Sequence, residues 1–349
     1  MKAKLIAIVS FLFLAQLAWG ARKPFIGWSS LHNPVLSYPD WSIKDFAVAY
    51  RNKVFYVFFS AFYEDGGQVR SHVVEVITPD FKSYSKPIMD FDGQDDGFTG
   101  MCSPDVQKLG RIWELSFNSW GGDRTKPPHQ LFYMTSRDLI HWSPRHPIAA
   151  NLTAGRGVDD LTVTRIPGGY YAMWKDSIHP NGLPVRLAEQ KSQIPPWRYG
   201  LRPRLAEARS LSGPWHYVGP GYPILAMADG KENELIHENF EFIWIDGVLH
   251  VLASAYPEGH HAFLYALLDP DKPLAWGKGL KLDLPTESFN QLGPYDAGAI
   301  YDWRKYDGFF YLVYAGHNDR TSYAHRGWNR MALARSKDLV HWVAAGSGN

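Results

Sequence analysis

The feature that most limits the possible folds is a repeat of about sixty residues. After residue 20, short runs rich in β-branched and aromatic residues recur, whereas long amphipathic helices are hard to find. Each run follows a turn that carries glycine or polar residues, which is typical of a β-hairpin. The five runs are residues 54–59, 112–117, 170–174, 248–252 and 309–314.

An acidic residue precedes each of these hairpins, at separations of 60, 55, 78 and 58 residues. The five residues are Asp45, Asp105, Asp160, Glu238 and Asp296. A second segment also recurs, because Ser-Arg-Asp-Leu-Ile-His-Trp at 136–142 is matched by Ser-Lys-Asp-Leu-Val-His-Trp at 336–342. Such self-similarity at a fixed period indicates a repeat architecture.

We therefore expect an all-β fold, a five-bladed β-propeller that forms one domain over residues 21–349. About sixty residues hold the four short strands of one blade. Five units over these 329 residues give 66 residues each. A β-sandwich or two barrels is the alternative, but neither predicts one acid at the same place in each unit.

Residues 1–20 are typical of a secretory signal peptide. Lys2 and Lys4 precede an apolar run of 14 residues, Leu5 to Ala18, and small residues follow at the expected cleavage point after Gly20. An uncleaved membrane anchor is the alternative, although the run is short for a bilayer. We expect a secreted or periplasmic protein that does not contact the membrane after cleavage.

Composition excludes several classes of function. The net charge of +1 leaves no basic surplus for a nucleic-acid partner. A single cysteine, Cys102, excludes an internal disulfide framework and a multi-cysteine metal site. Aromatic residues reach 15%, which favours strands and suits stacking on sugar rings. Trp120 and Trp174 are our candidates for substrate stacking, and packing between blades is the alternative for each.

The placement of the five acids predicts chemistry at the propeller axis. Residues at the same place on the innermost strand of every blade face one central channel. Carboxylates gathered there raise one another's pKa, which is costly for stability. The cost indicates a function, either acid–base catalysis or the binding of a cation.

Three segments resemble glycoside hydrolase family 43 and its five-bladed-propeller relatives. Asp45-Phe46-Ala47-Val48 is similar to the segment that carries that family's catalytic base. Ser103-Pro104-Asp105-Val106 is similar to its Pro-Asp-Val motif, whose Asp tunes and orients the acid. Glu238, nine residues before Gly247, is similar to its general acid. Glu241, in the same segment, is the alternative acid.

The flanking residues depart from that family's pattern. Lys44-Asp45-Phe46 replaces His-Asp-Pro, and Glu238-Asn239-Phe240 replaces Glu-Gly-Pro. The resemblance therefore implies a distant member or a sister family. The repeated Ser-x-Asp-Leu-x-x-Trp segments are structural in the same superfamily.

The function implied by the resemblance is hydrolysis of glycosidic bonds in plant or algal oligo- or polysaccharides. An inverting reaction needs a base and an acid roughly 6.5–9.5 Å apart. Arabinofuranosides or xylosides are the first substrates to consider, and anhydro-galactosides the second. Asp160 and Asp296 are expected to contact substrate, with a turn cap and a salt bridge as their respective alternatives.

Two other functions stay open: an inert carbohydrate-binding propeller and a glycoside phosphorylase of similar fold. No cofactor is required, although calcium or another divalent cation could lie in the channel. The sequence does not indicate an oligomeric state.

Overall fold

The computed structural model describes residues 25–120, 130–154, 157–177, 201–219, 223, 225, 236–256, 261–317 and 329–347. The expected signal peptide lies outside these ranges, so its assignment stays a prediction. Within them, no helix has the length and apolar character needed to cross a membrane.

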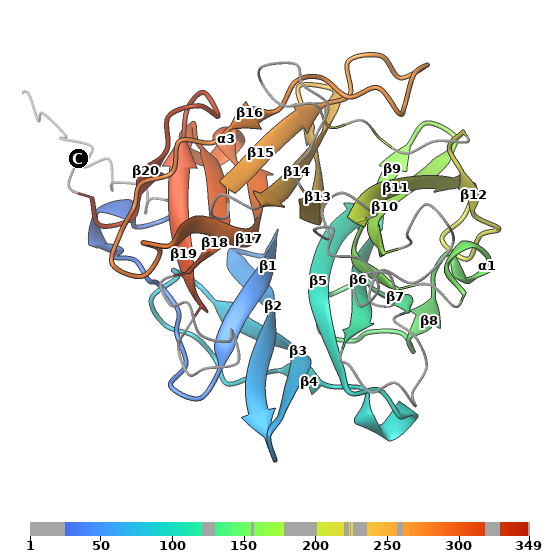
Figure 1. The fold of residues 1–349 in the computed structure, drawn as a ribbon. Helices are drawn as coiled ribbons and strands as arrows, with labels where there is room; N and C mark the ends of the chain where they lie inside the picture. The colour runs from blue at the N-terminus through green and yellow to red at the C-terminus, as the bar shows by residue number, and fades with distance from the viewer. Residues whose placement is uncertain are drawn as a thin grey trace, which may run out of the picture.

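The strands form five four-stranded antiparallel sheets around a common axis, which confirms the predicted five-bladed propeller (Figure 1). Blade one contains β1 (Ser42–Arg51), β2 (Val54–Asp65), β3 (Gln68–Thr78) and β4 (Met89–Phe91). Blade two contains β5 (Gly100–Leu109), β6 (Ile112–Trp120), β7 (Leu131–Ser136) and β8 (His146–Pro147). Blade three contains β9 (Val158–Ile166), β10 (Gly169–Ser177), β11 (Leu201–Ala208) and β12 (His216–Tyr217).

Blades four and five follow the same order. Blade four contains β13 (Ile236–Ile245), β14 (Val248–Tyr256), β15 (His261–Ala266) and β16 (Leu280–Lys281). Blade five contains β17 (Gly293–Asp302), β18 (Phe310–His317), β19 (Asn329–Ser336) and β20 (Val343–Ala344). The short helical turns are η1 (Trp28–Ser30), η2 (Gln94–Asp96), α1 (Ala150–Thr153) and α3 (Arg304–Asp307).

The first strand of each blade lies at the axis. Contacts join β1 to β5, β5 to β9, β9 to β13, β13 to β17, and β17 back to β1, so the inner strands form a closed ring. Residues ahead of β1 strengthen this closure. The backbone N–H of Val35 donates to the carbonyl of Met331 in β19 at 2.8 Å, and Met331 donates to the carbonyl of Leu36 at 3.0 Å.

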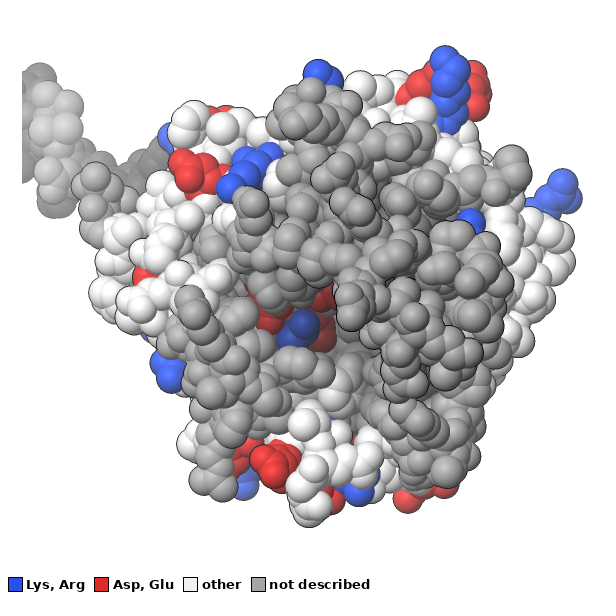
Figure 2. All heavy atoms as spheres, in the orientation of Figure 1, with Lys and Arg blue, Asp and Glu red and all other residues white. Residues whose placement is uncertain are grey.

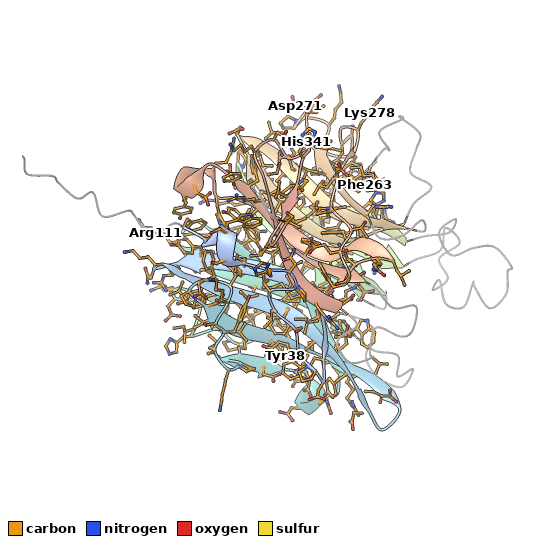
Figure 3. All side chains as sticks on the ribbon, turned by 90° about the vertical axis from the view of Figure 1, so that its left-hand side faces the viewer. Tyr38, Arg111, Phe263, Asp271, Lys278 and His341 are labelled. Carbon is orange, nitrogen blue, oxygen red and sulfur yellow. The ribbon has the colours of Figure 1, made fainter. Side chains whose placement is uncertain are left out.

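The hydrophobic core is divided into five clusters, one between each pair of neighbouring blades. The side view shows side chains filling these interblade spaces, while labelled exposed residues such as Arg111 and Lys278 lie at the periphery (Figure 3). The alternating β-branched and aromatic residues of the hairpins supply both faces of each sheet. Most of the aromatic side chains therefore pack between blades.

The repeated segments at 136–142 and 336–342 form the same turn in blades two and five. The hydroxyl of Ser136 accepts the N–H of Leu139 at 2.9 Å, and Asp138 accepts the N–H of His141 at 2.8 Å. The bonds in the second segment have the same lengths. These side chains satisfy backbone donors in a tight turn, which agrees with the structural role implied for them.

Candidate active site

A β-bulge interrupts the inner strand of every blade next to the first hairpin partner. The pairing register shifts between Lys44 and Ala47 in β1, and equivalent shifts occur in the other four blades. Bulges bend a strand and re-aim side chains, and they are frequent beside active sites. The bulges therefore lie at the axis, where the acids were expected, and change the direction of the side chains there.

Four bulge residues have left-handed backbone conformations: Asp45 (φ 56°), Ser103 (φ 54°), Asp160 (φ 60°) and Asn239 (φ 54°). This conformation is unfavourable for residues other than glycine, though Asn and Asp tolerate it best. We call this set the bulge residues. Their shared conformation shows that they occupy the same structural position in blades one to four.

The expectation of one acid at the same place in each blade is wrong. Asp45 and Asp160 are bulge residues, whereas blades two and four carry Ser103 and Asn239 at that position. Glu238 lies one residue before its bulge residue, and Asp105 lies two residues after its own. Spacing to the hairpin turn could not reveal these offsets, because the extra residue of a bulge leaves no mark in the hydrophobic pattern.

Asp45 is buried at the axis and held by donors from two blades. Its Oδ2 accepts a 2.6 Å bond from the hydroxyl of Ser60, and its Oδ1 accepts a 2.9 Å bond from the Asn239 amide. The Nζ atom of Lys44 lies 3.6 Å from the same carboxylate and 3.8 Å from Asp296. Burial raises the pKa of Asp45 to about 6, although Lys44 opposes the shift. Asp45 is thus mostly ionised at neutral pH.

Asp160 lies beside Asp45 and is joined to it through Asn239. The Asn239 amide also donates to Asp160 Oδ1 at 3.4 Å, and Ser103 donates to the same oxygen at 2.9 Å. The hydroxyl of Ser254 donates to the Asn239 carbonyl oxygen at 2.9 Å, which fixes the direction of the amide. Two carboxylates therefore share one oriented donor.

Lys175 extends this network to Glu238. Its Nζ atom lies 2.7 Å from Glu238 Oε2, 3.0 Å from Asp160 Oδ2 and 4.0 Å from Asp159 Oδ2. The contacts run in the order Asp45, Asn239, Asp160, Lys175, Glu238, and we call this the axial chain. In Figure 2 a basic side chain lies among acidic ones in a hollow near the middle of the face. The side chains of Lys175 and Glu238 are 13% and 17% exposed, so solvent reaches this end of the chain.

Asp105 and Glu241 form a second, deeper pair of acids. Their carboxyl groups are hydrogen-bonded to each other, and the Gln107 amide donates to Glu241 at 2.9 Å and to Asp105 at 3.2 Å. Thr162 donates to Asp105 at 2.7 Å. Burial raises the pKa of Asp105 to about 6 and that of Glu241 well above its usual range. The pair therefore holds a proton at neutral pH.

This pairing changes one expectation. The resemblance implied that Asp105 tunes the acid, which was taken to be Glu238. The acidic side chain that is hydrogen-bonded to Asp105 is Glu241. The difference follows from the bulges, because Asp105 and Glu241 both lie two residues after the bulge residue of their strands.

A small cavity is lined by both groups of acids. About 20 Å³ of it is available to the centre of a water molecule, enough for one buried water. Among its lining residues are Asp45, Asp160 and Asn239 from one group and Asp105 and Glu241 from the other. The arrangement can hold a water molecule between carboxyl groups that differ in protonation.

The two tryptophan candidates have different outcomes. Trp174 is 0% exposed and belongs to the core cluster between blades two and three, so its predicted role in stacking on a sugar is wrong. The packing alternative holds for it, because the alternation of β10 directs Trp174 away from the channel and Lys175 toward it. Trp120 is partly exposed at the end of β6 and contacts Phe62 edge to face at 5.2 Å. Its role in stacking stays a prediction.

The sequence pattern did not reveal the polar partners of the axial acids. Lys44, Lys175, Ser60 and Asn239 all contact the axial acids, yet none was singled out as a site residue. Lys44 and Asn239 are next to predicted acids in the sequence, and this adjacency could have indicated that they lie at the axis. Lys175 lies on a second strand, where the spacing of acids carries no information.

The described residues of the channel do not form a ready cation site. Among the residues that the structure places, no group of three or more His, Cys, Asp or Glu side chains is arranged to hold a metal ion. The carboxylates of Asp45 and Asp160 accept bonds from Ser60, Ser103 and Asn239 and contact lysines instead. These residues do not fit the suggested calcium, and we derive no step through one.

Comparison with solved structures places this fold among the five-bladed propeller glycosidases. A glycosyl hydrolase from Bacteroides ovatus is similar, with a TM-score of 0.60 and 15% identity over 90% of this chain and 94% of the other. The family GH43_1 enzyme from Xanthomonas citri in complex with xylose gives 0.59 and 13%, over 91% and 93%. The fold is that of family GH43 and its relatives.

A third structure comes from family GH130, described as mannoside phosphorylases that include hydrolases of β-1,2-mannosidic linkages. It gives a TM-score of 0.58 and 16% identity over 88% of this chain and 87% of the other. No protein-family model matches the chain, and no curated protein does. At these identities the similarity establishes the fold, and a function must be argued from the site.

Proposed function

We propose that this protein is a glycoside hydrolase in which Asp45 is the general base and Glu238 is the general acid. The observation that carries the proposal is the axial chain, which links the buried carboxyl group of Asp45 through Asp160 to the carboxyl group of Glu238 at the solvent-reached end of the chain. Glycoside hydrolysis characteristically uses such a pair of carboxyl groups.

Asp45 has the properties of a base. Its pKa of about 6 leaves it ionised at neutral pH but able to take a proton. Ser60 and Asn239 hold its two oxygens in one orientation. In the proposed reaction Asp45 removes a proton from water while the water oxygen bonds to the anomeric carbon.

The access of Glu238 to the channel mouth supports its assignment as the acid. Its proton would pass to the oxygen of the leaving group as the bond between that oxygen and the anomeric carbon breaks. Asp160 and Lys175 lie between Asp45 and Glu238 in the axial chain, which supports a gap wide enough for water and hence inversion.

Glu241 is a weaker choice for the acid. It holds a proton, but it is 5% exposed and hydrogen-bonded to Asp105. We therefore assign Asp105 and Glu241 to the support of the site.

Charge at the mouth favours hydrolysis over phosphorolysis. Among the described residues, seven ionisable side chains lie in or beside the axial chain, and their carboxylates outnumber their ammonium groups by five to two. These residues are Lys44, Lys175, Asp45, Asp159, Asp160, Glu238 and Asp296. Such a set repels inorganic phosphate, which a phosphorylase must bind.

Plant or algal glycans are the proposed substrates, with arabinofuranosides or xylosides first and anhydro-galactosides second. The xylose complex of the Xanthomonas citri enzyme, which shares this fold, supports that order. Asp160 and Asp296 are proposed to contact sugar hydroxyl groups. We also propose that residues 1–20 direct export.

The test is substitution of each assigned acid. Asp45→Asn and Glu238→Gln should each lower kcat by about 10²–10⁴-fold and leave sugar binding in place. Exposed Asp271→Asn and Glu207→Gln are matched controls that should keep wild-type turnover. Wild-type turnover in Asp45→Asn or Glu238→Gln would disprove the assignment. Sugar binding without turnover in the wild type would favour the inert binding propeller.

A further inference from the structure

Lys175 is a largely buried lysine that the proposed reaction does not yet use. It lies on β10, the second strand of blade three, and its ammonium group contacts the assigned acid Glu238 more closely than any other carboxylate. Burial by itself lowers the pKa of a lysine, but Asp160, Glu238 and Asp159 together raise the pKa of Lys175 well above its usual value. Lys175 is therefore charged across the working pH range.

This contact opposes the role of Glu238 in the empty site. A positive charge at 2.7 Å favours the ionised carboxylate, whereas a general acid must carry a proton when the bond breaks. Among the charged groups of the described residues, Lys175 contacts Glu238 directly, Lys44 acts on it from a longer distance, and Asp159 and Asp160 face the same ammonium group of Lys175. Lys175 is the nearer base, so it has the larger effect.

Asp160 offers Lys175 a second partner within the same reach. Its Oδ2 lies 3.0 Å from the ammonium group and accepts no hydrogen bond from another side chain among the placed residues. The other oxygen of Asp160, Oδ1, accepts hydrogen bonds from Ser103 and Asn239. A small movement of the flexible lysine could therefore exchange Glu238 for Asp160 without leaving the ammonium unpaired.

We propose that Lys175 is a positioning residue that determines when Glu238 can act as the acid. This inference rests on the proposed function. In the empty site Lys175 holds Glu238 ionised. When a sugar brings the leaving-group oxygen to Glu238, Lys175 moves onto Asp160 and Glu238 takes a proton from solvent. As Glu238 gives that proton to the leaving oxygen, Lys175 stabilises the carboxylate that forms again.

The test compares two pH profiles of the full-length protein. The profile of kcat/KM reports the free enzyme, and that of kcat reports the substrate complex. In the wild type, the alkaline limb of kcat/KM should lie at lower pH than the alkaline limb of kcat. Lys175→Gln should move the kcat/KM limb upward by about one pH unit or more. Lys175→Arg keeps the charge and should restore the wild-type limb.

A second variant tests the exchange itself. Asp160→Asn removes the alternative carboxylate, so Lys175 should stay on Glu238 and the alkaline limb of kcat should fall toward that of kcat/KM. Exposed Lys278→Gln is the matched control and should leave both limbs unchanged. If Lys175→Gln does not fold, the pH profiles of Asp160→Asn still test the inference.

The outcomes separate this inference from the proposed function. If Glu238→Gln abolishes turnover but Lys175→Gln lowers the rate without moving either limb, Lys175 is only structural and the inference is overturned. If Glu238→Gln keeps wild-type turnover, the proposed function itself is overturned, whatever Lys175→Gln does.

Discussion

Asp105 and Glu241 are hydrogen-bonded through their carboxyl groups, and each lies two residues beyond the bulge residue of its strand. Two buried acids can lie this close only if they share a proton, because two adjacent carboxylates would repel each other. The pair supports the floor of the water-sized cavity that Asp45 also lines. Its effect on the proposed reaction is therefore indirect.

Asp105→Asn should lower kcat by about tenfold, far less than the roughly 10²–10⁴-fold expected for Asp45→Asn. An asparagine keeps the packing of Asp105 but changes the hydrogen bond to Glu241. Steady-state kinetics of the two variants on one substrate would measure the difference. Equal losses in both variants would assign Asp105 to the reacting groups.

The activity of the wild type should rise with pH through about 6. The base must be ionised, and burial raises the pKa of Asp45 to about 6, so activity is lost as Asp45 gains a proton below that pH. The acid limb of kcat against pH measures this value, because kcat reports the substrate complex, in which Glu238 carries its proton. An acid limb near pH 4, the range of an ordinary Asp, would contradict the assignment of Asp45.

Asn239→Asp should move that acid limb to higher pH. The substitution places a third carboxyl group against Asp45 and Asp160, and a nearby negative charge raises the pKa of a carboxyl group. Asp also tolerates the left-handed backbone of this position. The control is Asn239→Ala, which adds no charge. If the acid limbs of Asn239→Asp and Asn239→Ala lie at the same pH, the prediction is refuted.

Glu75→Gln should stabilise the protein at alkaline pH. Glu75 is fully buried on β3, and burial raises its pKa from 4.5 to about 8 even though Trp142 donates a hydrogen bond to it. Since the folded state binds the proton more tightly, the stability from Glu75 is complete below about pH 4.5. It is lost as pH rises to about 8, at a cost of roughly 4 kcal/mol.

Thermal unfolding at several pH values checks this prediction. The Tm of Glu75→Gln should exceed that of the wild type by several degrees at pH 8, and the advantage should shrink toward pH 4. Glu64→Gln, an exposed change on the neighbouring strand β2, should show no such trend. A constant difference between Glu75→Gln and the wild type at every pH would show that Glu75 does not titrate as described.

The blades were predictable from the sequence because each carries its own hairpin signal. The strand after Arg51-Asn52-Lys53 and that after Asp246-Gly247 begin where the turns indicate, and positive φ angles at Asn52, Lys53, Asp246 and Gly247 match hairpin turns. Local backbone preferences and side-chain alternation were sufficient for this level of the structure.

The register of the acids was not predictable from spacing. Glu238 and Asn239 are neighbours in the sequence, yet Asn239 takes the bulge position that Asp45 and Asp160 take in their blades. Which residue occupies a bulge depends on contacts across the axis, such as the amide that joins Asn239 to Asp45. Those contacts join residues 194 positions apart, beyond the reach of local patterns.

The most direct test of the account is proton NMR of the sugar released by the wild type from a panel of plant and algal oligosaccharides, with phosphate present. We predict a free sugar whose first anomer is inverted relative to the bond cleaved, and loss of this signal in Asp45→Asn and Glu238→Gln. Release of a sugar 1-phosphate, or the same free sugar from Asp45→Asn at the wild-type rate, would contradict hydrolysis by this pair.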